Sequence, residues 1–328
     1  GNLRITIDAD ALAELDVALD DQVSIDLSDA AISKALEQIA DDRGLVCVVE
    51  KTQVLLTSPE EHRQRLIARD YLLDDLARDK AETEMLGLLV QKLVAPESWQ
   101  IAGGRGKLGA MERGLSITQT ESMHYRIAVF LDKLRTARGL PPRSGLQREL
   151  FSLQTRQAAA KPMLQRELTA NFRQPTALGE VLRYLAQAAD CQILIDHAAL
   201  AAAGRTAASK ASLAVHKQPL GTALRELLGP LGLAWWVVDK RTIEITSRRA
   251  LGARLELEFY PIRHLLDAGT SPAELCETIR TRVAPASWNE AGGPAAMYFD
   301  KPSACLIVLQ SQPAQAAVEQ LLAEAARR

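Results

Sequence analysis

The six-residue sequence VAPESW at residues 94–99 recurs as VAPASW at residues 283–288, with five of the six letters identical and an offset of 189 residues. Five identities in six places arise by chance in roughly one sequence in a hundred at average residue frequencies. The same offset pairs Gly103-Gly104 with Gly292-Gly293. Matches that extend beyond the six letters indicate that one long unit occurs twice in the chain.

The repeat continues toward the N-terminus with an offset of 188, where Asp8 matches Asp196 and the apolar positions of residues 32–44 match those of residues 220–232. Each copy is too long for a solenoid repeat and long enough to hold its own core. The chain is therefore predicted to be one unit used twice, with small loop insertions between matched segments.

The second copy is complete, and its first half predicts a strand–helix–strand cycle followed by a strand–helix–strand–strand cycle. The predicted strands are residues 168–172, 191–195, 212–215, 233–238 and 242–246. The first helix is expected to start at Gln174-Pro175-Thr176, and both helices carry apolar residues at helical spacing. The two stripes are Leu178, Val181, Leu182, Leu185 and Ala186, then Leu220, Ala223, Leu224, Leu227 and Leu228.

The remainder of the second copy predicts a strand–helix–strand–strand–helix order. At residues 255–260, apolar letters alternate with Glu256 and Glu258, which is the period-two pattern of a half-buried strand. Ser271-Pro272 opens a helix, strands follow near residues 296–299 and 305–309, and a helix ends the chain. Helices on one face of a small sheet predict an α+β fold.

The first copy has the same elements except the first strand and helix. We expect those to precede residue 1; alternatively, residues 146–164 pack into the gap. The predicted segments are a short N-terminal-type domain (1–60), a KH-like domain (61–137), a basic connector (138–166), and the second copy of each domain (167–248 and 249–328).

Composition indicates a globular chain with no membrane span. The 328 residues are 47% hydrophobic and 24% charged, the net charge is −2, and no apolar run reaches the roughly 18 residues that cross a bilayer. Cysteines at 47, 191, 276 and 305 stand alone, so we expect buried free thiols, with no metal site and no cofactor.

Charge is unevenly distributed along the chain. Residues 1–60 hold 13 acidic and four basic side chains, whereas residues 133–173 hold nine basic and two acidic ones. Two such regions could pair within or between molecules; the plainer interpretation is a solvated linker and a solvated acidic face.

Few residues have the pattern of a catalytic or binding motif. The five histidines (His62, His124, His197, His216 and His264) do not recur between copies. Asp8 and Asp196 do recur, and each is predicted to cap a helix. The glycines at 103, 104 and 106 could form the backbone-clamping loop of a KH domain, but their position before a strand favours a plain turn.

The tryptophans are the candidate contact residues. Trp99 and Trp288 recur, whereas Trp235 and Trp236 are adjacent on one strand and must point to opposite faces. One of that pair can enter the core, and the other needs a cover, either the neighbouring half-unit or a partner protein. Core packing is the favoured role for all four, and partner contact or inter-domain packing is the alternative.

Two pairs of segments resemble the periplasmic domains of secretins. VSIDLSDAAISKALEQIADDRGLVCVVEKTQVLLTS (23–58) and SLAVHKQPLGTALRELLGPLGLAWWVVDKRTIEITS (212–247) resemble the secretin and TonB short N-terminal domain. LSITQTESMHYRIAVFLDKL (115–134) and LIVLQSQPAQAAVEQLLAEA (306–325) resemble the end of the KH-like secretin domain. The arrangement is similar to that of uncharacterised bacterial envelope proteins carrying this pair in tandem.

The resemblance implies a non-enzymatic module that binds proteins or self-assembles in the periplasm. It departs from a secretin because no membrane-barrel region is present in the sequence and because the domain pair repeats around a basic connector. The alternative is nucleic-acid binding through the KH-like halves and the connector, although the net charge disfavours it. A third possibility is an enzyme with its site between the copies.

Overall fold

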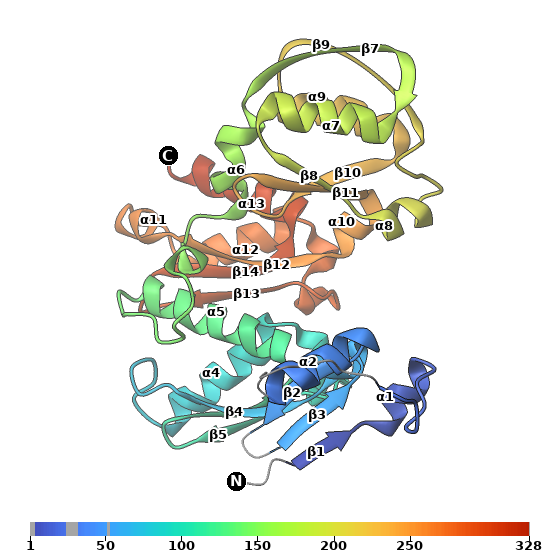
Figure 1. Cartoon of the computed structure of the whole chain (residues 1–328). Coiled ribbons are helices and arrows are strands. Elements are labelled where there is room, and N and C mark those ends of the chain that lie inside the picture. The colour runs from blue at the N-terminus through green and yellow to red at the C-terminus, as the bar shows by residue number, and fades with distance from the viewer. Residues whose placement is uncertain (1–3, 24–31, 51–52, 328) are drawn as a thin grey trace. The chain divides into compact units, whose positions relative to one another are not determined.

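The chain folds into helices and small separate sheets of two or three strands, in a computed structural model that describes residues 4–23, 32–50 and 53–327 (Figure 1). The α+β class predicted from the sequence is confirmed. The chain divides into two compact units, Gly1–Gln91 with Ala95–Ala128 and Lys92–Val94 with Val129–Arg328. None of the helices in the described ranges has the length and apolarity needed to cross a bilayer.

The first sheet of the first unit has the order β1-β3-β2, in which β3 is parallel to β1 and antiparallel to β2. Its elements are β1 (Arg4–Ile7), α1 (Ala9–Glu14), α2 (Ile32–Asp42), β2 (Val46–Glu50), β3 (Gln53–Thr57) and α3 (Pro59–Gln64). Leu12, Ala40, Leu45 and Leu56 form its core. Residues 24–31 and 51–52 of the segment that resembles a short N-terminal domain lie outside the described residues.

The second sheet of the first unit has the order β4-β6-β5 and is antiparallel throughout. Its elements are β4 (Ile67–Leu72), α4 (Lys80–Leu93), β5 (Lys107–Met111), β6 (Gly114–Gln119) and α5 (Glu121–Ala137). The boundary between the two units falls inside α5, after Ala128. One helix therefore contributes residues to both units.

The second unit begins with three layers, in which two helices lie between a two-stranded ribbon and a three-stranded sheet (Figure 1). The ribbon is β7-β9 and the sheet has the order β10-β11-β8. The elements are β7 (Glu167–Ala177), α7 (Leu178–Ala189), β8 (Gln192–Ile195), α8 (His197–Ala202), β9 (Lys210–Pro219), α9 (Leu220–Leu228), β10 (Leu233–Val237), β11 (Thr242–Ser247) and α10 (Arg248–Ala253). Both predicted apolar stripes point into the shared core.

Helix α7, the first helix of the predicted second copy, starts later than predicted. The Gln174-Pro175-Thr176 sequence belongs to β7, which stays paired with β9 as far as Ala177 opposite Lys210. Helix α7 therefore begins at Leu178. The ribbon tolerates Pro175 because the pairing is irregular between Phe172 and Thr176, where no ladder hydrogen bond is needed from the proline.

The last sheet of the second unit has the order β12-β14-β13, and it has the same antiparallel order as β4-β6-β5. Its elements are β12 (Leu255–Pro261), α11 (Arg263–Asp267), α12 (Pro272–Arg282), β13 (Ala296–Asp300), β14 (Cys305–Ser311) and α13 (Gln312–Ala325). One apolar cluster joins Leu275 and Ile279 of α12 and Val318 of α13 to Leu306 and Val308 of β14.

The predicted half-buried character of β12 is wrong. Glu256 and Glu258 are 6% and 3% exposed, whereas Leu255 and Leu257 on the other face are only partly buried. Polar and apolar side chains do alternate between the two faces of β12, but the face that carries the glutamates is buried. Other parts of the second unit supply the partners that make this burial tolerable.

The connector between the predicted copies is a folded part of the second unit and not a solvated linker. Phe151 is buried, and helix α6 (Arg156–Leu164) buries Ala160, Met163 and Leu164 in the main core. Thr155 caps α6 by accepting a hydrogen bond from the Ala158 amide. The connector is thereby held on the second unit by apolar contacts as well as by charge.

Candidate functional site

The aspartates and histidine that could take part in catalysis or metal binding have structural roles. Asp8 and Asp196 cap α1 and α8 as predicted, because each accepts a hydrogen bond from the backbone amide three residues later. In the part of the chain that the structure describes, no cluster of His, Cys, Asp and Glu side chains has the arrangement of a metal site. Of the cysteines, Cys276 and Cys305 are buried free thiols, while Cys47 and Cys191 are half-buried.

His124 is buried between β4 and α5. Its Nε2 lies 2.7 Å from the Ile67 carbonyl oxygen and its Nδ1 lies 2.8 Å from the Tyr71 hydroxyl. Because the carbonyl can only accept, Nε2 carries the proton and Nδ1 accepts from Tyr71. Burial lowers the pKa of His124 and raises that of Tyr71 to about 12, so the pair stays neutral. This geometry fixes the helix to the strand.

Trp99 and Trp288 are both buried at the start of a tight turn. Each pairs as an isolated bridge with a residue seven positions on, and the Trp288 indole donates to the Val283 carbonyl at 2.7 Å. The alanine of each VAP sequence, Ala95 or Ala284, has a left-handed backbone with φ of 44° or 42°. The repeated letters therefore specify a turn built around a buried ring.

The glycines after each tryptophan are required by close backbone approach. A Cβ at Gly104 would lie 2.2 Å from the Ser98 carbonyl carbon, and one at Gly293 would lie 2.1 Å from the Ser287 carbonyl oxygen. No side chain fits at either position. The plain turn expected for the glycine-rich loop is confirmed by this packing.

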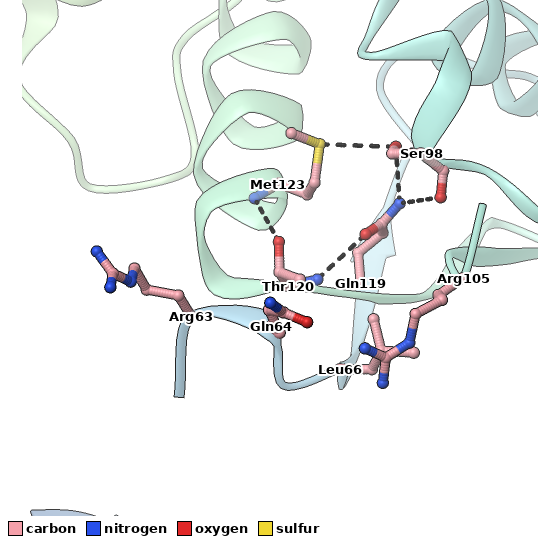
Figure 2. Close-up of a pocket in the computed structure, with 8 residues that line it drawn as sticks. All are labelled: Arg63, Gln64, Leu66, Ser98, Arg105, Gln119, Thr120 and Met123. Atoms are coloured by element: carbon pink, nitrogen blue, oxygen red, sulfur yellow. Dashed lines mark hydrogen bonds between the residues drawn. The ribbon is translucent and has the colours of Figure 1, made fainter. Parts of the chain in front are cut away.

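A shallow pocket of about 310 Å³ lies beside the first of these turns (Figure 2). Figure 2 shows the Ser98 hydroxyl bonded to the Gln119 amide nitrogen, at 3.0 Å, and to the Met123 sulfur. The second unit has the same serine–glutamine bond, from Gln310 to Ser287 at 2.7 Å. The polar wall of this pocket is thus a brace for the turn.

Trp236 points away from the main core and is covered by charged side chains of its own unit. The guanidinium carbon of Arg254 lies 3.5 Å from the ring centroid and that of Arg156 lies 5.8 Å away. The indole N–H donates to Glu244, which also pairs with Arg254 at 2.7 Å. Cation–π contacts of this kind hold the connector helix α6 and the C-terminal end of α10 against the edge strand β10.

The buried glutamates of β12 lie next to this cover. Arg156 pairs with Glu256 at 3.0 Å, and its backbone amide donates to Glu258 at 3.2 Å. Burial raises the pKa of both carboxyl groups, against the lowering effect of Arg156 and Lys133. Burial in turn lowers the pKa of Lys133, whose Nζ lies 5.8 Å from the Phe259 ring centroid. These groups form a network that ties α5, α6 and β12 together.

The free edge of β10 is blocked by a side chain from α13. Gln312 accepts from the Val237 amide at 2.8 Å and donates to the Val237 carbonyl at 2.7 Å. A side-chain amide thereby occupies the hydrogen-bonding positions that another strand would use. Blocking an edge in this way protects a sheet from pairing with other chains.

Several cations of the connector region are already used inside the second unit. Arg135 pairs with the buried Asp132 at 2.9 Å, and Arg138 pairs with the buried Asp300 at 2.6 Å. Burial alone would raise the pKa of Asp132, but hydrogen bonds from Ser144, Arg143 and Arg135 bring it below its ordinary value. The excess positive charge of residues 133–173 is therefore largely neutralised by carboxylates of the second unit. It does not form a continuous exposed cationic surface.

Trp235 faces the opposite side of β10 and lines an open groove of about 570 Å³. We name this the basic groove; it lies between α6, α9 and α13, and its charged lining residues are Lys161, Arg225 and Glu319, beside Leu164, Thr222 and Trp235. Lys161 and Arg225 are exposed, and no carboxylate among the described residues lies within ion-pair distance of either. Trp235 is only partly buried. The groove is thus apolar at its floor, and it is lined by two cations and by one carboxylate, Glu319, which accepts a hydrogen bond from the Thr155 hydroxyl.

The sequence identified the tryptophans but not their surroundings. Trp236 lies under Arg156 and Arg254, and Trp235 lies in the basic groove, while Trp99 and Trp288 are each buried in their own turn. The four do not form one site. No sequence pattern could have located the groove, because its small residues Ala158, Gly221 and Ala316 come from three separate helices.

No protein-family model and no curated protein matches the sequence. Among solved structures, the chain is similar to the crystal structure of the GspC–GspD complex of the type II secretion system of enterotoxigenic Escherichia coli, at 13% identity and a TM-score of 0.18. That match covers 49% of this chain and 99% of the other.

Two structures of XcpQ are also similar. The N-terminal domain of the secretin XcpQ from Pseudomonas aeruginosa matches at 15% identity and a TM-score of 0.18, covering 49% of this chain and 65% of the other. The structure of XcpQN012 matches at 10% identity and a TM-score of 0.20, covering 50% and 66%. At these identities and TM-scores, we assign no property of the matched proteins to this chain.

Proposed function

We propose that this chain is a non-catalytic interaction module of the bacterial cell envelope, which docks a protein partner or further copies of itself. In this proposal the chain holds two tandem copies, each a short N-terminal-type domain followed by a KH-like domain, and it works in the periplasm. The support is the internal repeat of the sequence, its resemblance to secretin periplasmic segments, and the equal strand order of the two KH-like sheets.

The observation that carries the proposal is the basic groove. It combines a partly buried aromatic floor with two exposed cations, Lys161 and Arg225, that have no ion-pair partner among the described residues of their unit, and with one carboxylate, Glu319. Aromatic and arginine side chains are the types that dominate the energy of protein interfaces. The edge of β10, by contrast, is already occupied by Gln312, so docking through that edge is disfavoured.

The test is site-specific photo-crosslinking in the producing cell, combined with sedimentation velocity of the purified chain. A photoreactive residue at Thr222, in the groove, should form defined protein adducts, whereas one at the exposed Lys240 should not. Reversible self-association of the purified chain would also support the proposal. A chain that stays monomeric up to about 1 mM, and forms no adducts from the groove, would overturn it.

The nucleic-acid alternative has a separate measurement. Because nucleic-acid affinity depends on neutralised phosphates, it falls steeply with salt. We expect no change in the fluorescence anisotropy of labelled single-stranded oligonucleotides when the chain is added at low salt. Oligonucleotide binding that weakens as the salt concentration rises would show that the partner is a nucleic acid and not a protein.

A further inference from the structure

The first unit carries an exposed segment in which carboxylates flank apolar side chains. We name residues 15–23 the acidic segment. Leu19 is 68% exposed and lies between Asp16 and Asp20, and Leu15 and Val23 are also exposed. No cation among the described residues is within ion-pair distance of Asp16 or Asp20. The segment thus presents apolar side chains flanked by unpaired carboxylates.

The acidic segment is held in one shape by Arg43. The guanidinium pairs with Asp21 at 3.0 Å and also donates to the Gln22 carbonyl at 2.8 Å. Asp21 in turn accepts a hydrogen bond from the Ala18 amide. A segment that is already ordered loses less conformational entropy when it binds than a disordered one does.

We propose that the acidic segment of one molecule docks in the basic groove of a second copy of this chain. Asp16 and Asp20 pair with Lys161 and Arg225 at the rim, and Leu19 packs on the floor of the groove. The inference rests on the proposed function, because it names a second copy of the chain as the partner. Charge complementarity selects this occupant, since Asp16 and Asp20 have no ion-pair partner among the described residues of the first unit, and Lys161 and Arg225 have none among those of the second.

The contact uses different surfaces on the two molecules. Each chain therefore keeps a free acidic segment and a free groove after one contact forms, so assembly continues head to tail or closes into a ring. A contact of this small area is weak, and exposed ion pairs are screened by salt. Self-association should accordingly increase with protein concentration and decrease with ionic strength.

Charge reversal tests the contact with the full chain. One variant combines Lys161→Glu with Arg225→Glu, and the other combines Asp16→Lys with Asp20→Lys. Each alone places like charges at the contact, so the dissociation constant from sedimentation velocity should rise by at least about tenfold. A rise of less than about twofold in either variant would overturn the proposed contact.

Mixing the two charge-reversed variants is the decisive experiment. In the mixture each groove meets a segment of opposite charge, so association should return to within about threefold of the natural chain. Failure of the mixture to associate would refute docking between copies, because only contacts between molecules can be restored by mixing. A natural chain that is monomeric up to about 1 mM would refute it as well.

Matched controls change the same charge on the same unit but away from the contact. Lys240→Glu with Arg249→Glu is the control for the groove, and Asp70→Lys with Glu112→Lys is the control for the segment; all four side chains are exposed. Neither control should change the dissociation constant by more than about twofold. A control that weakens association as much as its test variant would mean that net charge, not this contact, governs assembly.

The proposed packing of Leu19 on the floor of the groove has a separate test. Leu19→Ser should weaken association by about fivefold to tenfold because it removes the side chain expected on Trp235. Ile101→Ser, at a residue 78% exposed elsewhere on the same unit, should have no effect. If association persists unchanged in Leu19→Ser and in both charge reversals, this contact is wrong while an assembly function stands. Adducts from the groove with a different protein would likewise contradict only this contact.

Discussion

The ion pair between Arg138 and Asp300 is expected to be one of the strongest single contacts of the second unit. Arg138 follows α5 and donates to both carboxylate oxygens of Asp300, at 2.6 and 3.1 Å. The Asp300 side chain is 0% exposed, and Asp300 is the last residue of β13. Substituting Arg138→Met keeps most of the aliphatic volume but leaves a buried carboxylate without its cation.

Removing one partner of a buried ion pair typically costs about 3–5 kcal/mol. Asp300 keeps hydrogen bonds from the amide and hydroxyl of Ser303, so we expect the low end of that range, about 3 kcal/mol. In a unit of this size each kcal/mol lowers the melting temperature by about 2–4 °C, which predicts a decrease of about 6–12 °C.

Thermal melts followed by tryptophan fluorescence provide the assay, because three of the four tryptophans (Trp235, Trp236 and Trp288) belong to the second unit. The matched control is Arg148→Met, an exposed connector arginine, which should change the free energy of unfolding by less than about 0.5 kcal/mol. Adding Asp300→Asn to Arg138→Met should recover part of the loss, since no unpaired charge is then buried. The reasoning is refuted if Arg138→Met costs less than about 1 kcal/mol or if the double variant is less stable than the single one.

Three further predictions concern other parts of the second unit. Gly293→Ala should destabilise it by more than about 2 kcal/mol in urea titrations, because the new Cβ meets Ser287 backbone; a neutral result would contradict the close approach. Burial raises the pKa of Glu258 above 4.5, so the stability it supports is present below that pH and is lost as the pH rises through the raised pKa. Glu258→Gln should therefore gain stability relative to the natural chain as the pH rises above 4.5, and parallel pH curves would argue against the raised pKa. Gly221→Ala should stabilise α9 by about 0.5–1 kcal/mol, as its Cβ would make ordinary contacts of 3.5 Å or more with Leu164, and a lower melting temperature would count against this.

Local patterns predicted most elements because their physical causes are local. The stripe from Leu178 to Leu185 forms α7, and the stripe from Leu220 to Leu228 forms α9, because one apolar side of each helix must be buried. The aspartates at 8 and 196 cap helices because a carboxylate satisfies backbone amides that the first turn leaves free. The predicted start of α7 was wrong because strand pairing with β9, a distant segment, overrode the helix-start signal of Pro175.

The repeated letters around the two tryptophans by themselves determined a turn, since a left-handed alanine, a buried ring and two glycines specify one local path of the backbone. Only the tertiary structure decided which charges are buried. The sequence pattern places Glu256 and Glu258 on a solvent-facing side of the strand. In the structure, Arg156, about a hundred residues earlier, pairs with Glu256, and the charge of Lys133 lowers the pKa of both glutamates. The groove beside Trp235 likewise exists only where α6, α9 and α13 converge. The alternation of residues along a strand shows which side chains share a face. The partners that allow a charged side chain to be buried come from segments far away in the sequence, and no local pattern identifies them.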